Sequence, residues 1–143
     1  MRPAFLDHIT VLVRDLAASR TFYEAALAPF AARVIEYGPD DIGVGPEGSE
    51  DLGLKQGEPG APTHIAFLAA DPATVDAFHA AALEAGATDN GPPGRRPQYD
   101  ERYYAAYVLD PDGNNVEAVC HNGPTEAEAA PAAPAPLPAP RQA

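Results

Sequence analysis

The sequence of 143 residues has very little cysteine and few basic residues. Its one cysteine, Cys120, excludes an intrachain disulfide and fits a reducing compartment such as the cytoplasm. Only 9 Lys and Arg stand against 21 Asp and Glu, and the resulting net charge of −12 argues against binding to nucleic acid, which needs clustered basic side chains. The charge is compatible with a cationic ligand, although a soluble acidic surface explains it more simply.

The sequence also lacks a long apolar run. No stretch approaches the length that spans a membrane, and the N-terminal residues lead directly into strand-like sequence without a signal peptide. We therefore expect a cytoplasmic protein that acts on a small molecule and binds neither membranes nor nucleic acids. The length suits one domain, or two small halves that share a core.

The chain contains an internal repeat. The first element of each copy is a predicted strand that carries a histidine. Residues 6–13 alternate with a period of two and place His8 and Thr10 on one face of a predicted strand. Residues 63–69 form an equivalent strand with His64 on one face. An isoleucine follows the histidine in both copies, so the two strands share one register.

Each of these strands leads into a predicted helix. Asp15 and Asp71 each follow the histidine by seven positions and suit a helix N-cap. The shared spacing predicts a βαβββ unit that occurs twice, as module 1 at about 5–57 and module 2 at about 62–122, within a domain of residues 1–122. We expect an α+β fold in which the two modules form curved mixed sheets around a shared groove.

The C-terminal residues 123–143 differ in composition from the rest of the chain. They consist mostly of Ala, Pro and Glu. Such a composition buries little apolar surface and favours extended chain, so we expect a disordered tail.

The most informative stretch is residues 103–121, which predicts two strands joined by a tight turn at residues 110–114. Glu117 lies in the second strand between two apolar residues. Burial of a carboxylate without a partner costs several kcal/mol. We therefore expect Glu117 to have a partner.

A metal ion is one such partner. If the two sheets surround one groove, His8, His64 and Glu117 converge there. Two imidazoles and one carboxylate leave coordination positions open and suit one divalent ion of Fe, Mn, Co, Ni or Zn. A single histidine or glutamate on a strand is more often structural, but the matching register of the two histidines strengthens the metal hypothesis.

Four motifs occur in order along the chain: HITVLVRDL, FYEAAL, THIAF and YVLDPDGNNVEAV. Together with the repeated βαβββ unit, they resemble the vicinal-oxygen-chelate superfamily of glyoxalases, extradiol dioxygenases, fosfomycin-resistance thiol transferases and bleomycin-resistance proteins. The resemblance covers residues 5 to about 122. It implies a glyoxalase-like fold, a homodimer, metal ligands at His8, His64 and Glu117, and a substrate with two neighbouring oxygens. In some dimers of this superfamily both chains supply ligands.

The reaction stays open, because this fold hosts unrelated chemistries. Glyoxalase I carries a second acid on the last strand of its first repeat, whereas residues 51–56 have apolar residues at the middle positions, which argues against lactoylglutathione lyase activity. The fosfomycin enzymes use a threonine at the position of Thr10, but their potassium loop has no counterpart in residues 91–102. A metal-dependent lyase, dioxygenase or thiol transferase is expected, and a metal-free drug-binding protein of the bleomycin-resistance type is the alternative.

Other side chains are candidates for substrate binding near the groove. Tyr103, Tyr104 and Tyr107 supply aromatic surface with hydroxyl donors, and Tyr104 is the candidate for substrate binding, although all three would serve equally well as core and rim aromatics. Arg95 and Arg96 lie on a predicted Gly/Pro/Arg loop at residues 91–98, where they could clamp an anionic group if the loop closes. His121 is predicted to share a strand face with Glu117, where it could serve as a proton shuttle or be only the frayed end of the strand.

Overall fold

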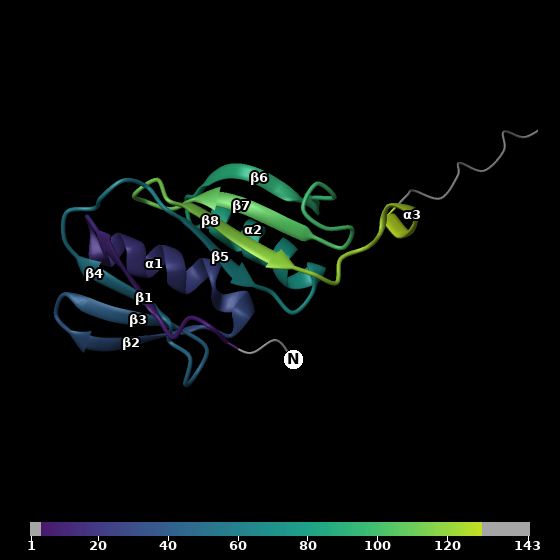
Figure 1. Ribbon diagram of the computed structural model, residues 1–143. Coiled ribbons are helices and arrows are strands. Elements are labelled where there is room, and N and C mark those ends of the chain that lie inside the picture. The colour runs from purple at the N-terminus through teal and green to yellow at the C-terminus, as the bar shows by residue number, and fades with distance from the viewer. Residues whose placement is uncertain (1–3, 130–143) are drawn as a thin grey trace, which may run out of the picture.

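A computed structural model describes residues 4–129 and contains two four-stranded mixed sheets with helices packed on them (Figure 1). The first half contains one α-helix, a 3-10 helix and four strands: β1 (Ile9–Val13), α1 (Leu16–Ala26), η1 (Ala28–Phe30), β2 (Arg33–Gly38), β3 (Asp41–Gly45) and β4 (Leu52–Gln56). The second half contains β5 (His64–Leu68), α2 (Pro72–Glu84), β6 (Thr88–Arg95), β7 (Tyr104–Leu109) and β8 (Asn115–Cys120), followed by the short helix α3 (Glu126–Ala129).

The two sheets have the same topology. Their strand orders are β1-β4-β3-β2 and β5-β8-β7-β6, and in each sheet the first and last strands of the module pair in parallel. The predicted α+β class with two βαβββ units is therefore confirmed. The sheets do not close into a barrel, because β1 and β5 remain edge strands of separate sheets.

The two edge strands nevertheless lie beside one another. One cavity of about 170 Å³ is lined by residues 6–9 and 65–67, and another of about 390 Å³ is lined by residues 9–12 and 59–61. From the first cavity to the second, the lining residues rise in number from 6–9 to 9–12 on the β1 side and fall from 65–67 to 59–61 on the β5 side. β1 and β5 therefore run in opposite directions. This arrangement brings β5, which begins at His64, and β1, which His8 directly precedes, to the junction of the two halves. The predicted strand at residues 6–13 thus begins only at Ile9.

Both predicted helix caps are present. Asp15 Oδ1 accepts a hydrogen bond from the Ala18 amide, and Asp71 Oδ1 accepts bonds from the amide and the hydroxyl of Thr74. These two donors lower the pKa of Asp71, since they stabilise its ionised form. Pro72 occupies the first turn of α2, where a missing N–H removes no helical bond.

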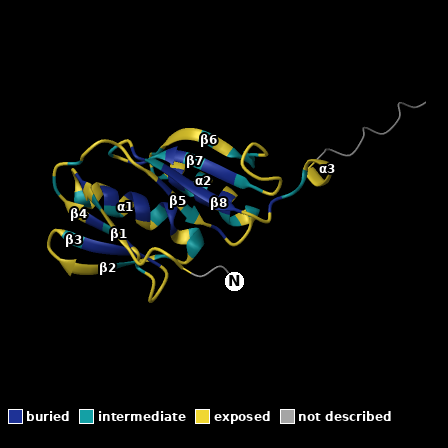
Figure 2. Ribbon diagram, in the orientation of Figure 1, coloured by how far each residue is buried: buried dark blue, intermediate teal, exposed yellow. Residues whose placement is uncertain are grey.

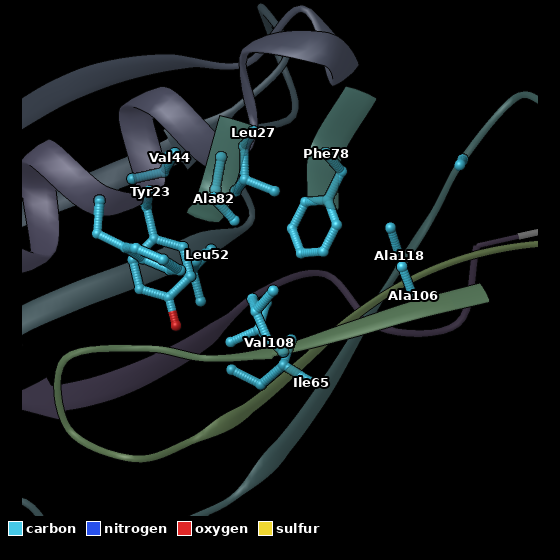
Figure 3. Close-up of a cluster of buried hydrophobic side chains, with 14 of the residues drawn as sticks. Tyr23, Leu27, Val44, Leu52, Ile65, Phe78, Ala82, Ala106, Val108 and Ala118 are labelled. Carbon is cyan, nitrogen blue, oxygen red and sulfur yellow. The ribbon is translucent and has the colours of Figure 1, made fainter. Parts of the chain in front are cut away.

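One core joins the two halves. Phe30 of η1 packs against both Phe67 and Phe78, with ring centroids 6.2 Å apart in each pair. Figure 3 shows Tyr23 of α1 and the C-cap residue Leu27 on the same side of the sheets as Phe78 and Ala82 of α2. Burial is concentrated in α1, α2 and the inner strands, while β2 and β6 are largely exposed (Figure 2). The apolar sides of both modules therefore form one hydrophobic interior.

The prediction of a loop at residues 91–98 is wrong for its first half. β6 continues to Arg95 and pairs with β7, with register shifts around Gly91 and Gly94. Pro92 and Pro93 disguised this strand in the sequence, but prolines are tolerated here because β6 is an edge strand with bulges.

The structure also describes the beginning of the predicted tail. The Gly123 amide donates to the Arg102 carbonyl, and the Arg95 side chain donates to the Pro124 carbonyl. Arg102 pairs with Glu128 of α3 at 3.2 Å. The remainder of the predicted disordered tail, residues 130–143, lies outside the described residues. Among the helices of residues 4–129, none is long and apolar enough to cross a membrane.

Candidate metal and substrate site

Glu117 is the buried acid of the second sheet. It lies on β8, an inner strand between β5 and β7, and only 2% of its side chain is exposed. Its Oε2 is 2.8 Å from His64 Nε2, and its Oε1 accepts a hydrogen bond of 2.5 Å from the Tyr103 hydroxyl. Glu117 is thus paired, as its place in the sequence required.

The partners of Glu117 are unusual because none is permanently charged. Within residues 4–129, neither a lysine nor an arginine forms an ion pair with its carboxylate. The His64 imidazole is 53% exposed and therefore accessible from solvent. A buried carboxylate beside an open imidazole forms a two-donor site for a cation.

Three tyrosines and His121 surround this pair. Tyr107 lies directly across from Glu117 in the β7–β8 ladder, and burial together with the Glu117 charge raises the pKa of Tyr107 to about 12. The Tyr103 ring packs against the tilted Tyr99 ring with centroids 5.0 Å apart and meets His121 edge-on at 5.3 Å. Burial and the hydrogen bond to Glu117 also raise the pKa of Tyr103, so its hydroxyl stays protonated and acts as a donor.

His8 lies apart from this pair in the described chain. Its side chain is 68% exposed, and its Nδ1 is 2.6 Å from Asp7 Oδ1. His8 and Thr10 instead line a hollow of about 410 Å³ on the first sheet, together with Tyr37 and Gly53. Between residues 4 and 129, no group of three or more His, Cys, Asp or Glu side chains is close enough to hold a metal.

Tyr104 lies on the other face of β7 from Glu117. Its hydroxyl donates to Asp76 on α2 at 2.7 Å, so it packs on the helix side of the sheet. The period of two explains this placement, because Tyr103 and Tyr107 share the face of Glu117 and Tyr104 takes the opposite face.

The two predicted arginines are held by backbone carbonyls instead of projecting from a free loop. Arg95 donates to the Pro124 carbonyl, and Arg96 donates to the Pro92 carbonyl at 2.7 Å. The Arg96 guanidinium also lies over the Tyr107 ring, 5.4 Å from its centroid. Arg96 therefore borders the Glu117 site through Tyr107, while Arg95 anchors the segment that follows β8.

His121 follows the end of β8, which stops at Cys120, so the predicted shared strand face does not extend to it. Its ring still reaches the site because it contacts Tyr103, and its Nδ1 is 3.9 Å from Asp100 Oδ2. Cys120 points to the core and is buried, which raises the pKa of its thiol.

The tyrosines next to Glu117 are Tyr103 and Tyr107, whereas the sequence-based prediction selects Tyr104. The position of Tyr107 can nevertheless be derived from the sequence. The turn pairs Leu109 with Asn115, and counting outward from that pair places Tyr107 opposite Glu117. Tyr103 precedes β7 and could not be found in this way, because its approach depends on the path of the preceding loop.

His64 and Glu117 fit a divalent metal as two of its ligands. Imidazole nitrogen and carboxylate oxygen are donors that first-row metals accept. Two ligand atoms on one metal at about 2.0–2.2 Å lie about 3 Å apart, and the Nε2–Oε2 distance of 2.8 Å is close to that separation. Across the described part of the chain, no further His, Cys, Asp or Glu side chain lies close enough to act as a third ligand in this arrangement.

Comparison with known proteins agrees with this fold. The chain belongs to the Glyoxalase/Bleomycin resistance protein/Dioxygenase superfamily, whose family model matches residues 5–118. A glyoxalase/bleomycin resistance protein from Albidiferax ferrireducens T118 is 30% identical with a TM-score of 0.68, and the match covers 80% of this chain and 97% of that one. No curated protein is significantly similar to the chain.

Two further structures share the fold at lower identity. A glyoxalase/bleomycin resistance protein/dioxygenase family enzyme from Burkholderia phytofirmans PsJN is 23% identical, with a TM-score of 0.64 and coverage of 82% of this chain and 98% of that chain. A lactoylglutathione lyase from Agrobacterium tumefaciens is 22% identical, with a TM-score of 0.62 and coverage of 84% and 96%. At these identities the likeness defines the fold and leaves the reaction open.

Proposed function

We propose that the protein is a divalent-metal-dependent enzyme that acts in the cytoplasm on a small substrate with two neighbouring oxygens. The observation that carries this proposal is the buried Glu117 carboxylate, which has the accessible His64 imidazole 2.8 Å away and no lysine or arginine partner among the described residues 4–129. A metal bound by these two groups would supply the missing positive charge.

The bound metal, of Fe, Mn, Co, Ni or Zn, would act as a Lewis acid that polarises a substrate oxygen. The residues of the chain would have separate tasks around it. His64 and Glu117 would hold the ion, and Tyr103 would orient the carboxylate through its hydrogen bond to Oε1. His121 lies at the edge of the aromatic cluster, where it is available to accept or donate a proton.

The absence of an acidic side chain at Gly53 on β4 narrows the choice of reaction classes. A Cβ atom on Gly53 would lie 2.9 Å from Thr10 Oγ1, so this position shares the face of Thr10 and carries no side chain. An acid for proton transfer is therefore missing where glyoxalase I is expected to have one, and we favour a dioxygenase, a thiol transferase or another lyase over lactoylglutathione chemistry.

We further propose that the protein acts as a homodimer and that His8 is the third ligand, from the same chain or from a second copy. The sheet faces away from the core carry exposed apolar side chains, including Leu12 at 43% and Leu68 at 69%. Exposed apolar surface at unclosed sheet edges is commonly covered by another chain.

Metal content tests the proposal. Protein purified without chelator and supplied with Fe(II), Mn(II), Co(II), Ni(II) or Zn(II) should bind one ion per site, and His64→Ala and Glu117→Gln should each lose it. His79→Ala is a matched control, because His79 is paired with Asp89 away from the site. Equal metal in the wild type and both site variants would overturn the assignment.

The second candidate function is metal-free binding of an organic cation. It is favoured by the same buried acid lying among Tyr99, Tyr103 and Tyr107, since aromatic faces and a carboxylate attract cations. The net charge of −12 would assist the approach of such a ligand. This function takes precedence if the wild type binds none of the five metals.

A further inference from the structure

The carboxylate of Glu117 has one distinct partner for each oxygen. Oε2 faces His64 Nε2 at 2.8 Å, and Oε1 accepts the hydrogen bond of the Tyr103 hydroxyl at 2.5 Å. Because the side chain is 2% exposed, water cannot easily replace either partner. The carboxylate is therefore fixed in rotation about its own axis.

The Tyr103 ring is itself held from two sides. The Tyr99 ring packs against it with centroids 5.0 Å apart and an interplanar angle of 55°, and the His121 ring meets it at an interplanar angle of 88°. Its backbone is also anchored, since its amide donates to Asp100 and its carbonyl accepts from Arg96. A donor that is fixed by both ring and backbone can impose one orientation on the acid that it contacts.

We propose that Tyr103 is a positioning residue for Glu117: it occupies Oε1 and thereby leaves Oε2 as the only carboxylate oxygen free to bind a metal beside His64. This inference rests on the proposed function. It adds that Glu117 binds the metal through one oxygen only. The coordination position that its second oxygen would otherwise take then stays open to substrate.

The test is Co(II) binding to Tyr103→Phe, which removes one oxygen atom and retains the ring. We expect affinity for Co(II) to fall about tenfold to hundredfold, as is typical when a partner of a metal ligand is lost. The visible absorption of bound Co(II) should also change, because the released carboxylate can add its second oxygen. The melting temperature measured in parallel reports whether the variant is folded.

Tyr104→Phe is the matched control. It removes a hydroxyl that also bonds a carboxylate, that of Asp76, but on the helix face of the same strand. Its Co(II) affinity and spectrum should equal those of the wild type. If Tyr103→Phe also matches the wild type, while Glu117→Gln loses the metal, the positioning role is refuted and the metal site stands.

An infrared measurement on wild-type protein tests the same inference without the tyrosine variant. Difference spectra with and without Zn(II), with Glu117→Gln to assign the band, should show the wide separation of carboxylate stretches that marks binding through one oxygen. A narrow separation would mean that both oxygens bind and would overturn the inference. Absence of any Zn(II) or Co(II) binding by the wild type would remove the proposed function and this inference together.

Discussion

The Tyr23 hydroxyl donates a hydrogen bond of 2.6 Å to Asp110 Oδ2 and so connects helix α1 of the first half with the β7–β8 turn of the second. Both residues are buried. The Asp110 carboxylate also accepts bonds from the amides of Asp112 and Asn114, which shape the turn. One acidic side chain thus organises the hairpin that carries Glu117 and joins this hairpin to the other module.

Tyr23→Phe should lower the free energy of unfolding by about 1–2 kcal/mol, because Asp110 loses a buried donor while its other donors remain. Urea unfolding monitored by circular dichroism measures this change. Tyr37→Phe is the control, since Tyr37 is 62% exposed and its hydroxyl is open to water. Equal stability of the two variants would show that the buried bond does not stabilise the junction.

Asp71→Ala should lower the melting temperature by removing the cap of α2. Hydrogen bonds from Thr74 hold the pKa of Asp71 below its usual value, so the ionised acid stabilises the fold above its unfolded pKa, about 3.9. That stabilisation is lost as the pH falls through the lower folded pKa.

The difference between wild type and Asp71→Ala should therefore be largest near neutral pH and shrink below about pH 4. Asp71→Ser is the control, because serine retains an N-cap acceptor that does not titrate. Melting curves from pH 7 to pH 3 measure the effect. A difference that stays constant across this range would contradict the assigned role.

Much of the fold follows from local patterns in the sequence. The caps at Asp15 and Asp71 and the turn at Asp110 are local, since each is formed by residues within a few positions. The repeated spacing of seven residues from histidine to helix cap predicted that the chain contains two similar βαβββ modules. The prediction failed at β6, because Pro92 and Pro93 are tolerated at a sheet edge, and edge position depends on the whole sheet.

The candidate site was predictable only where strand register determines it. Alternation predicts the strand face of His64 and of Glu117, the pairing of β5 with β8 brings the two side chains together, and the hairpin register places Tyr107 across from the acid. The contact of Tyr103 depends on a loop, and the place of His8 depends on how two separate sheets meet. Neither is encoded in a local pattern, so both had to come from the structure.

Residues 123–129 should contribute modestly to stability. A chain that ends after Ala129 retains the contacts of Arg95 and Arg102 with this segment, whereas a chain that ends after Asn122 loses them. We expect the shorter chain to melt a few degrees lower, because exposed ion pairs are weak and only part of the contact is buried. Identical melting temperatures would show that the segment adds nothing to the domain.

Mixing two defective variants distinguishes the source of the third ligand. If a second copy supplies His8, a heterodimer of His8→Ala and Glu117→Gln contains one intact site and should bind one metal ion. If His8 acts within its own chain, the mixture should bind no more metal than its components. Refolding the two together and measuring bound Zn(II) provides the readout, and wild type mixed with wild type sets the full value.

Anomalous diffraction from crystals soaked in Zn(II) or Co(II) would locate the metal ion that we propose His64 and Glu117 bind. We expect an anomalous peak between His64 Nε2 and Glu117 Oε2, within about 2.3 Å of both atoms. Tyr103 should remain hydrogen-bonded to Oε1. A peak elsewhere, or no peak with the His64–Glu117 hydrogen bond intact in the soaked crystal, would contradict the claim.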